Sequence, residues 1–135
     1  MRYEPYEDEY KAVPTMTDDE LFEYFLFSIL ETDEVWGLKA GASWMTRQVG
    51  EQETLPIWPF KRFALEAMAE NSQDLTPSAD SMEYFIYNTL SSYARQGVMM
   101  EIMPRSSGAG CLVHPQRFVT ILENTMHSAE YTLDD

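Results

Sequence analysis

Apolar side chains recur at helical spacing in the first quarter of the chain. The recurring positions, which follow the first at intervals of three, four, seven and eight residues, are Phe22, Phe25, Leu26, Ile29 and Leu30. This spacing places them on one face of an α-helix. Thr17 and Glu20 form a capping-box pattern just before it, in which each side chain accepts a hydrogen bond from the other residue's backbone amide. The pattern therefore predicts a helix over residues 18–31.

Three further apolar side chains, Leu21, Tyr24 and Phe27, lie off this stripe and widen the apolar surface of the same helix. A helix that is apolar on more than one face is either deeply buried or in contact with a second packing partner. The sequence leaves both alternatives open.

Aromatic and β-branched residues separated by turn residues predict three strands after this helix. Residues 34–38 and 43–48 are expected to form a hairpin. A third strand over residues 53–58 is expected after a turn at residues 49–52. Because Pro56 has no amide hydrogen to donate, this strand is expected to lie at a sheet edge or to end near that point.

The helical spacing returns after the third strand. Pro59 is expected in the first turn of a helix that ends at Asn71, because its missing donor costs nothing there. Residues 72–79 are expected to be a loop, since Pro77 interrupts regular structure.

The last part of the chain is expected to add two helices and two strands. Asp80 and Glu83 repeat the capping pattern before a helix that ends at a glycine. Short strands are expected over residues 98–103 and 111–113, and Pro115 opens a final helix.

This order, α-β-β-β-α-α-β-β-α, predicts an α+β fold with helices packed on a mainly antiparallel sheet. We expect one α+β domain over residues 17–127, with an acidic N-terminal segment over residues 1–16 and an acidic C-terminal tail over residues 128–135. The sequence leaves open whether the two strand groups join in one sheet.

The composition indicates where in the cell the protein is expected. The 135 residues suit a single domain, and the one cysteine, Cys111, excludes an internal disulfide framework. No stretch approaches the ~20 apolar residues that cross a bilayer. We therefore expect a cytoplasmic protein with no membrane association.

The net charge of −14 narrows the choice of partners. Residues 1–20 hold seven acids and two bases, and residues 123–135 hold four acids and no base, so most of the excess charge lies at the two ends. Such a balance argues against nucleic acid as a partner and favours a basic protein. The oligomeric state is not indicated.

Two short motifs flank Trp44: EVWGL at residues 34–38, and LPIWP at residues 55–59 before an alanine-bearing helix. Their order and spacing resemble a bacterial family catalogued as domain of unknown function 2750, over roughly residues 20–123. That family carries no assigned activity, so the resemblance implies a fold and no catalytic residue.

The tryptophans suggest a candidate ligand site. Trp36, Trp44 and Trp58 all fall in the predicted three-stranded segment, and Arg47 is close to them in sequence. Trp36 and Trp44 are placed to meet across the hairpin, where they would line a cleft for a planar or anionic group. The alternative is that these large aromatic side chains fill the core.

Other candidate sites receive a structural interpretation. Cys111 and His114 are three residues apart, but neither a positioned base nor an oxyanion donor is evident, so a buried thiol is the expected role. We expect no catalytic residue, no cofactor and no metal, because one cysteine and two histidines lack zinc-site spacing.

The loop over residues 104–110 contains two glycines, and its backbone amides suit either an anion-binding nest or a flexible connection between strands. The sequence favours the connection, since neither phosphate-binding fingerprint is present.

Two functions from different classes remain. The first is a non-enzymatic protein-binding module with an acidic surface, steered electrostatically to its partner and held by aromatic or methionine anchors. The alternative is a small-molecule-binding domain or small enzyme with a pocket near Trp36, Arg47 and Trp58.

Overall fold

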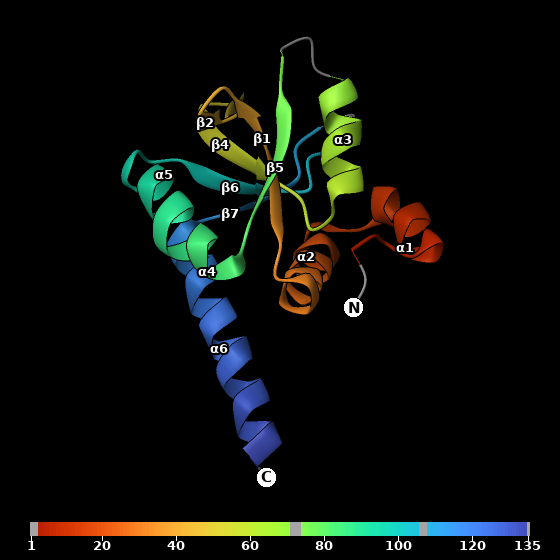
Figure 1. Ribbon diagram of the computed structural model, residues 1–135, viewed down its shortest axis with the longest axis vertical. Helices are drawn as coiled ribbons and strands as arrows, with labels where there is room; N and C mark the ends of the chain where they lie inside the picture. The colour runs from red at the N-terminus through yellow and green to blue at the C-terminus, as the bar shows by residue number, and fades with distance from the viewer. Residues whose placement is uncertain (1–2, 71–73, 106–107, 135) are drawn as a thin grey trace.

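A computed structural model describes residues 3–70, 74–105 and 108–134, with side chains described as far as residue 127. Figure 1 shows the arrangement of the helices and strands in these ranges. The strands are β1 (Val35–Ala40), β2 (Ser43–Trp44), β3 (Arg47–Val49), β4 (Gln52–Ile57), β5 (Thr76–Asp80), β6 (Met99–Ile102) and β7 (Cys111–Val113). The helices are α1 (Glu7–Ala12), η1 (Val13–Thr15), α2 (Asp18–Thr32), α3 (Lys61–Ala69), α4 (Met82–Tyr84), the π-helical η2 (Phe85–Leu90), α5 (Ser91–Arg95) and α6 (Pro115–Asp134). The expected α+β class is confirmed.

The strands form two sheets that share one backbone bridge. The first has the order β2-β1-β5 and the second the order β3-β4-β6-β7. All pairs are antiparallel except β4 with β6, which run parallel. Trp36 on β1 and Trp58 at the end of β4 exchange two backbone hydrogen bonds of 2.9 and 2.8 Å, and this bridge links the sheets.

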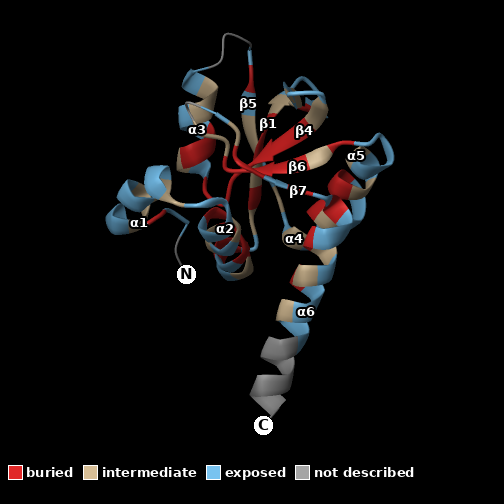
Figure 2. Ribbon diagram, turned by 180° about the vertical axis from the view of Figure 1, so that it is seen from behind, coloured by how far each residue is buried: buried red, intermediate tan, exposed pale blue. Residues whose placement is uncertain are grey.

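The helices cover the sheets from several sides. The helix α3 contacts β1 and β5, whereas α2 contacts β6 and β7. Buried residues gather where the strands meet α2 and the first turns of α6 (Figure 2). The remainder of α6 extends away from the body (Figure 1).

The predicted first helix is confirmed together with its cap. The Thr17 hydroxyl accepts from the Glu20 amide at 3.2 Å, and the Glu20 carboxylate accepts from the Thr17 amide at 3.0 Å. The helix ends at Thr32, where Asp33 adopts the left-handed conformation with φ 57°.

The loop predicted over residues 72–79 is wrong, because Thr76–Asp80 form β5. This strand lies at the edge of its sheet and pairs with β1, with Pro77 opposite Leu38. An edge strand has one row of amides without a ladder partner, so it tolerates a proline. The expected helix end at Asn71 lies outside the described residues. Pro59 is not in the first turn of the helix but precedes it, because the N-cap of α3 is Phe60.

The cap predicted at Asp80 is also wrong. Ser81 is the N-cap, and its hydroxyl accepts from the Tyr84 amide at 3.2 Å. Asp80 instead accepts from the Thr89 hydroxyl at 2.5 Å. The helix that follows contains the π segment η2, which the α-helical spacing of its apolar residues did not indicate.

The second strand of the predicted hairpin divides into β2 and β3, which belong to different sheets. The hairpin turn itself is confirmed, since Ala40 pairs with Ser43. Pro56 lies between the last β3–β4 pair, Arg47 with Thr54, and the Trp36–Trp58 bridge. On this side, β4 pairs first with β3 and then with β1. Pro56 lies between the two pairings, so its lack of an amide hydrogen breaks neither of them, and an internal strand can contain this proline.

Helices lie near both ends of the described chain. Residues 7–15 form α1 and η1 beside α2 and α3, and α6 runs from Pro115 to Asp134 (Figure 1). Within the described ranges, the helices include none with the length and apolar character needed to cross a bilayer.

Candidate functional site

Trp44 is a buried packing residue on the inner side of the β1–β2 hairpin. Its ring lies directly on Gly37, where an added Cβ would come within 1.8 Å of the indole. Phe85 approaches it edge-on at 6.1 Å, and the Tyr93 hydroxyl donates to its backbone carbonyl and accepts from its amide, the latter at 2.9 Å. Trp44 is thus buried by these contacts.

Trp36 and Trp44 do not meet across the hairpin. Successive side chains of a strand point to opposite faces, so Trp36 lies on the face of β1 opposite to Gly37. Its indole nitrogen donates to Glu34 at 3.3 Å, and the ammonium of Lys61 lies 5.8 Å from its ring centre. Trp58 is its neighbour through the backbone bridge and is itself buried.

Arg47, at the start of β3, neutralises a buried carboxylate on β6. Its guanidinium donates from Nε to Glu101 at 2.7 Å and from Nη2 to the second oxygen of the same carboxylate. Thr54 and the Gly110 amide also donate to Glu101, each at 3.0 Å. Glu101 is 0% exposed, so this network satisfies the one acid that is wholly inside the described fold.

The charge state of Glu101 follows from that network. Burial alone would raise its pKa, but the hydrogen bonds from Arg47, Gly110 and Thr54 outweigh burial and hold the pKa below its ordinary value. One amide of the loop after β6, that of Gly110, thus donates to a carboxylate of the protein itself. Arg47 also donates to the carbonyl of Gly108 at 3.3 Å, which fastens the loop from the other side.

The cysteine region offers no activated nucleophile. Burial raises the pKa of the Cys111 thiol, and the charges of Asp18 and Asp19 raise it further. The His114 imidazole accepts at Nδ1 from the amide of Gln116 at 3.1 Å. Among the described residues, no three His, Cys, Asp or Glu side chains come together as metal ligands would.

A groove runs along α2. It has a volume of about 340 Å³, and four of its lining side chains are carboxylates. These are Glu9, Glu20, Glu23 and Glu31. The described residues that line it include no basic side chain. The others are Met16, Tyr24, Phe27 and Ser28.

Helical spacing explains why these groups face the same way. Glu20, Glu23, Phe27 and Glu31 follow one another at intervals of three and four residues, which places them on one face of α2. The helix α1 supplies the remaining acid, since the Tyr24 hydroxyl donates to Glu9 at 3.2 Å. Hydrogen bonding to Thr17 lowers the pKa of Glu20 and so keeps it charged into the acidic range.

Phe27 is the exception to the polar character of this face. It is 59% exposed, although Phe25, two residues earlier, is completely buried. A large exposed apolar side chain between Glu23 and Glu31 is the one feature of α2 that packing within the described chain does not explain. Of the three apolar side chains off the main stripe, Leu21 is buried, Tyr24 packs against the rings of Phe60 and Phe63, and Phe27 is exposed.

Sequence reasoning noticed Phe27 but missed the groove. Of the four candidates, the structure brings Trp36 and Trp58 together through their backbone bridge, whereas Trp44 contacts Gly37 and Phe85, and Arg47 pairs with Glu101. The signal that identifies the groove is the spacing of three glutamates around one phenylalanine on a single helical face.

Comparison with known proteins identifies a family that covers most of the fold. The family model described as "Protein of unknown function (DUF2750)" matches residues 22–122. No curated protein and no solved structure matches the chain. The match takes in the two sheets, most of α2 and the first turns of α6, and on this basis the chain belongs to the DUF2750 family.

Proposed function

We propose that this protein is a non-enzymatic binding module that receives a basic, partly apolar segment of another protein in the groove of α2. The observation that carries the proposal is Phe27, which is 59% exposed in the middle of a groove lined by four glutamates.

Two physical effects act together at such a surface. Clustered carboxylates attract a positively charged partner over a Debye length of about 8 Å at physiological salt, which accelerates encounter more than it tightens the complex. A buried aromatic anchor at the centre of an interface supplies much of the affinity. Phe27 is placed for the second role, and Glu23 and Glu31, one turn away on either side, for the first.

The chemistry of the groove also defines its partner. Lysines or arginines spaced around one apolar side chain complement the glutamates and Phe27 at the same time. Nucleic acid and anionic membranes are repelled by the same charges. We place the module in the cytoplasm, a location favoured by its single buried cysteine.

The direct test measures binding of a fluorescently labelled basic peptide that carries lysines around a single tryptophan. We expect the peptide to bind the full-length chain, with affinity falling as salt is raised. Phe27→Ala and Glu23→Lys should each weaken binding by at least about 1 kcal/mol, the loss typical of an important interface residue.

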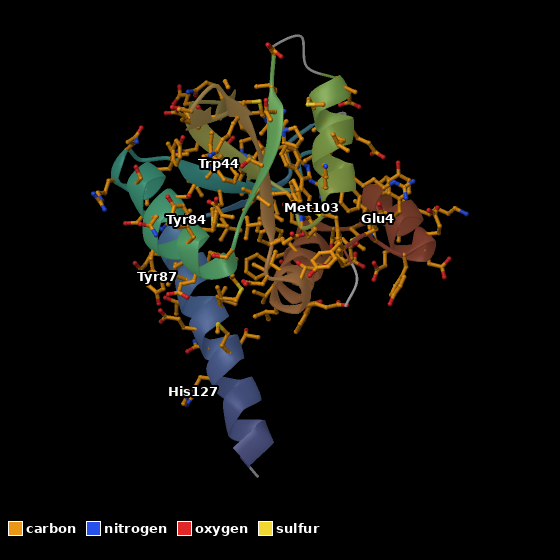
Figure 3. All side chains as sticks on the ribbon, viewed as in Figure 1. Glu4, Trp44, Tyr84, Tyr87, Met103 and His127 are labelled. Carbon is orange, nitrogen blue, oxygen red and sulfur yellow. The ribbon has the colours of Figure 1, made fainter. Side chains whose placement is uncertain are left out.

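Matched controls separate the groove from the overall charge. Glu83→Lys changes the net charge as much as Glu23→Lys does, but Glu83 lies on α4. Tyr87→Ala removes an aromatic residue that is 66% exposed on the outer side of η2 (Figure 3). If these controls weaken peptide binding as much as the groove variants, the proposal is wrong.

A further inference from the structure

A cleft with a volume of about 410 Å³ lies between the helical segments η2 and α5 on one side and the start of α6 on the other. Figure 1 and Figure 2 both show these helices side by side. The volume is within the range of pockets that hold small molecules. The cleft shares no described lining residue with the groove on α2.

The charge of the lining sets this cleft apart. Its described residues include one arginine and one histidine but no carboxylate. Three other hollows of the described fold are each lined by at least two glutamates. Because the chain has 23 acidic residues against nine lysines and arginines, a lining without an acid departs from the character of the whole protein. The cleft therefore suits an anion, which the acidic surface elsewhere repels.

Arg95, the last residue of α5, supplies the positive charge. Arg47, Arg62 and Arg105 each form an ion pair with a carboxylate of the described fold. Arg95 instead donates from Nη2 to the Ser91 hydroxyl at 3.2 Å, and among the described residues it has no carboxylate partner. A hydroxyl does not neutralise a guanidinium, and one bond leaves most of its five N–H donors for a bidentate carboxylate.

His114 adds a second donor to the cleft. Its Nδ1 accepts from the Gln116 amide at 3.1 Å, so the proton of the neutral ring lies on Nε2. Within the described ranges, Nε2 has no hydrogen-bond partner. The guanidinium and this N–H together offer one positive charge and several donors, which match a singly charged carboxylate better than a doubly charged phosphate.

The rest of the lining is mainly aliphatic. Leu90 and Pro115 are buried, Ile86 and Val119 are half-buried, and Ala94 is exposed. The half-buried and exposed members leave apolar surface that a ligand can cover. An alkyl chain gains free energy from contact with such a surface, at roughly 25 cal/mol for each Å² removed from water. The lining thus favours an anion that carries an alkyl chain.

One wall of the cleft is built from the π segment η2. Ile86, Tyr87 and Leu90 line the cleft from this segment. A π turn bonds residues five apart rather than four, which changes the direction of its side chains, and such turns occur frequently at functional sites. The irregular part of the helix therefore coincides with the cleft, which supports a binding role independently of the charges.

We propose that this cleft binds a small alkyl carboxylate, with its head group on Arg95 and His114 and its chain against Ile86 and Val119. The proposal is independent of the groove on α2, which has the opposite charge.

Three probes with the same chain test the charge preference. Octanoate, octanol and octylammonium are titrated, below the concentrations at which they form micelles, against the full-length protein. Binding is followed through the NMR signals of the Ile86 and Val119 methyl groups, because these report on the cleft and not on the acidic groove. We expect saturable binding of octanoate, about two- to fivefold tighter than that of octanol, as suits a solvent-accessible ion pair, and weaker binding of octylammonium.

The net charge of −14 makes this order a demanding test. Unspecific attraction to an acidic protein would favour octylammonium over octanoate. Octylammonium that binds the cleft as tightly as octanoate, or octanoate that does not saturate, would overturn the proposal.

Two arginine variants locate the head group. Arg95→Gln should lower the affinity for octanoate to that for octanol and leave octanol binding unchanged. Arg117→Gln makes the same charge change at an exposed residue of α6 that does not line the cleft, so it should have no effect. Equal effects of the two variants, or no effect of Arg95→Gln, would overturn the proposal.

A larger side chain in the cleft locates the alkyl chain. Ala94→Phe places a ring there from an exposed position of α5 and should abolish binding of octanoate and octanol. Ala69→Phe, at an exposed position of α3, is the matched control and should change neither. Octanoate binding that survives Ala94→Phe would overturn the proposal. Circular dichroism establishes whether Ala94→Phe is folded, and if it is not, the two arginine variants decide the question.

Discussion

Glutamate serves two opposite purposes in this molecule. Glu101, on β6, is wholly buried and receives hydrogen bonds from Arg47, Thr54 and Gly110. The glutamates of the α2 groove line an exposed surface and face one another without a basic side chain among the described residues of the lining. The same functional group thus stabilises the fold in one region and forms an exposed negative surface in the other.

The difference lies in where each carboxylate finds its counter-charge. A buried carboxylate is tolerated only when donors surround it, and here the chain itself supplies them. In the groove, Glu20 accepts from the Thr17 amide and Glu9 from the Tyr24 hydroxyl, so the donors that these acids meet within the chain are neutral. The comparison predicts that stability is sensitive to Glu101 and binding to the groove.

The largest expected effect comes from Glu101→Ala. This change leaves Arg47 without its partner and the Gly110 amide without an acceptor, so we expect a loss of about 3 kcal/mol in the free energy of unfolding, measured with urea. The value is at the lower end for a buried pair because Arg47 is partly exposed and regains water.

A double variant tests whether the loss reflects an abandoned charge. Arg47→Met combined with Glu101→Leu removes both charges and keeps apolar volume, so it should cost less than Glu101→Ala alone. A double variant as unstable as Glu101→Ala would contradict this interpretation of the network.

Gly110→Ala should have the next largest effect. An added Cβ would come within 2.3 Å of the Ile102 carbonyl, so the backbone must shift and the bond from the Gly110 amide to Glu101 is strained or lost. We expect a loss of about 2 kcal/mol in thermal or urea unfolding. Gly108→Ala, whose added Cβ meets nothing within 4 Å, is the matched control and should be near neutral.

Protonation perturbs the network more gently than deletion. Because the folded-state pKa of Glu101 is lowered, its contribution is fully present above the unfolded-state value near 4.5 and is lost as the pH falls through the lower folded-state value. Urea midpoints measured across that acidic range should fall more steeply for the natural protein than for Glu101→Gln. Equal slopes would mean that Glu101 does not titrate as described.

The smallest effects on stability are expected in the groove. Phe27→Ala and Glu23→Lys alter exposed positions of α2, so each should change the free energy of unfolding by less than about 0.5 kcal/mol. The same two variants are expected to weaken binding of the basic peptide. A large loss of unfolding free energy in either variant would show that the groove residues stabilise the fold as Glu101 does, and the comparison would be wrong.

Features determined by neighbouring residues were predictable from the sequence. The capping box of Thr17 and Glu20 specifies the start of α2 locally, and the turn at Gly41 specifies the β1–β2 hairpin. The strand β5 was missed because the segment around Pro77 has little intrinsic strand preference, and its conformation depends on pairing with β1.

The contacts of Arg47 could not be predicted, for the same physical reason. Arg47 was grouped with tryptophans near it in sequence, but its partner Glu101 is supplied by the far strand β6. The glutamates and Phe27 of α2 lie on one helical face and were open to prediction, whereas Glu9 joins them only because α1 folds back beside that helix.

The parallel pair of β4 and β6 also has a kinetic consequence. Thr54 pairs with Met99 across the whole of α3, β5 and the helix containing η2, so this ladder requires the closure of a long loop. Loop closure costs entropy before any contact repays it, and non-local pairing slows folding. We therefore expect the joining of β4 to β6 to limit the rate at which the chain refolds, whereas the local β1–β2 hairpin forms early.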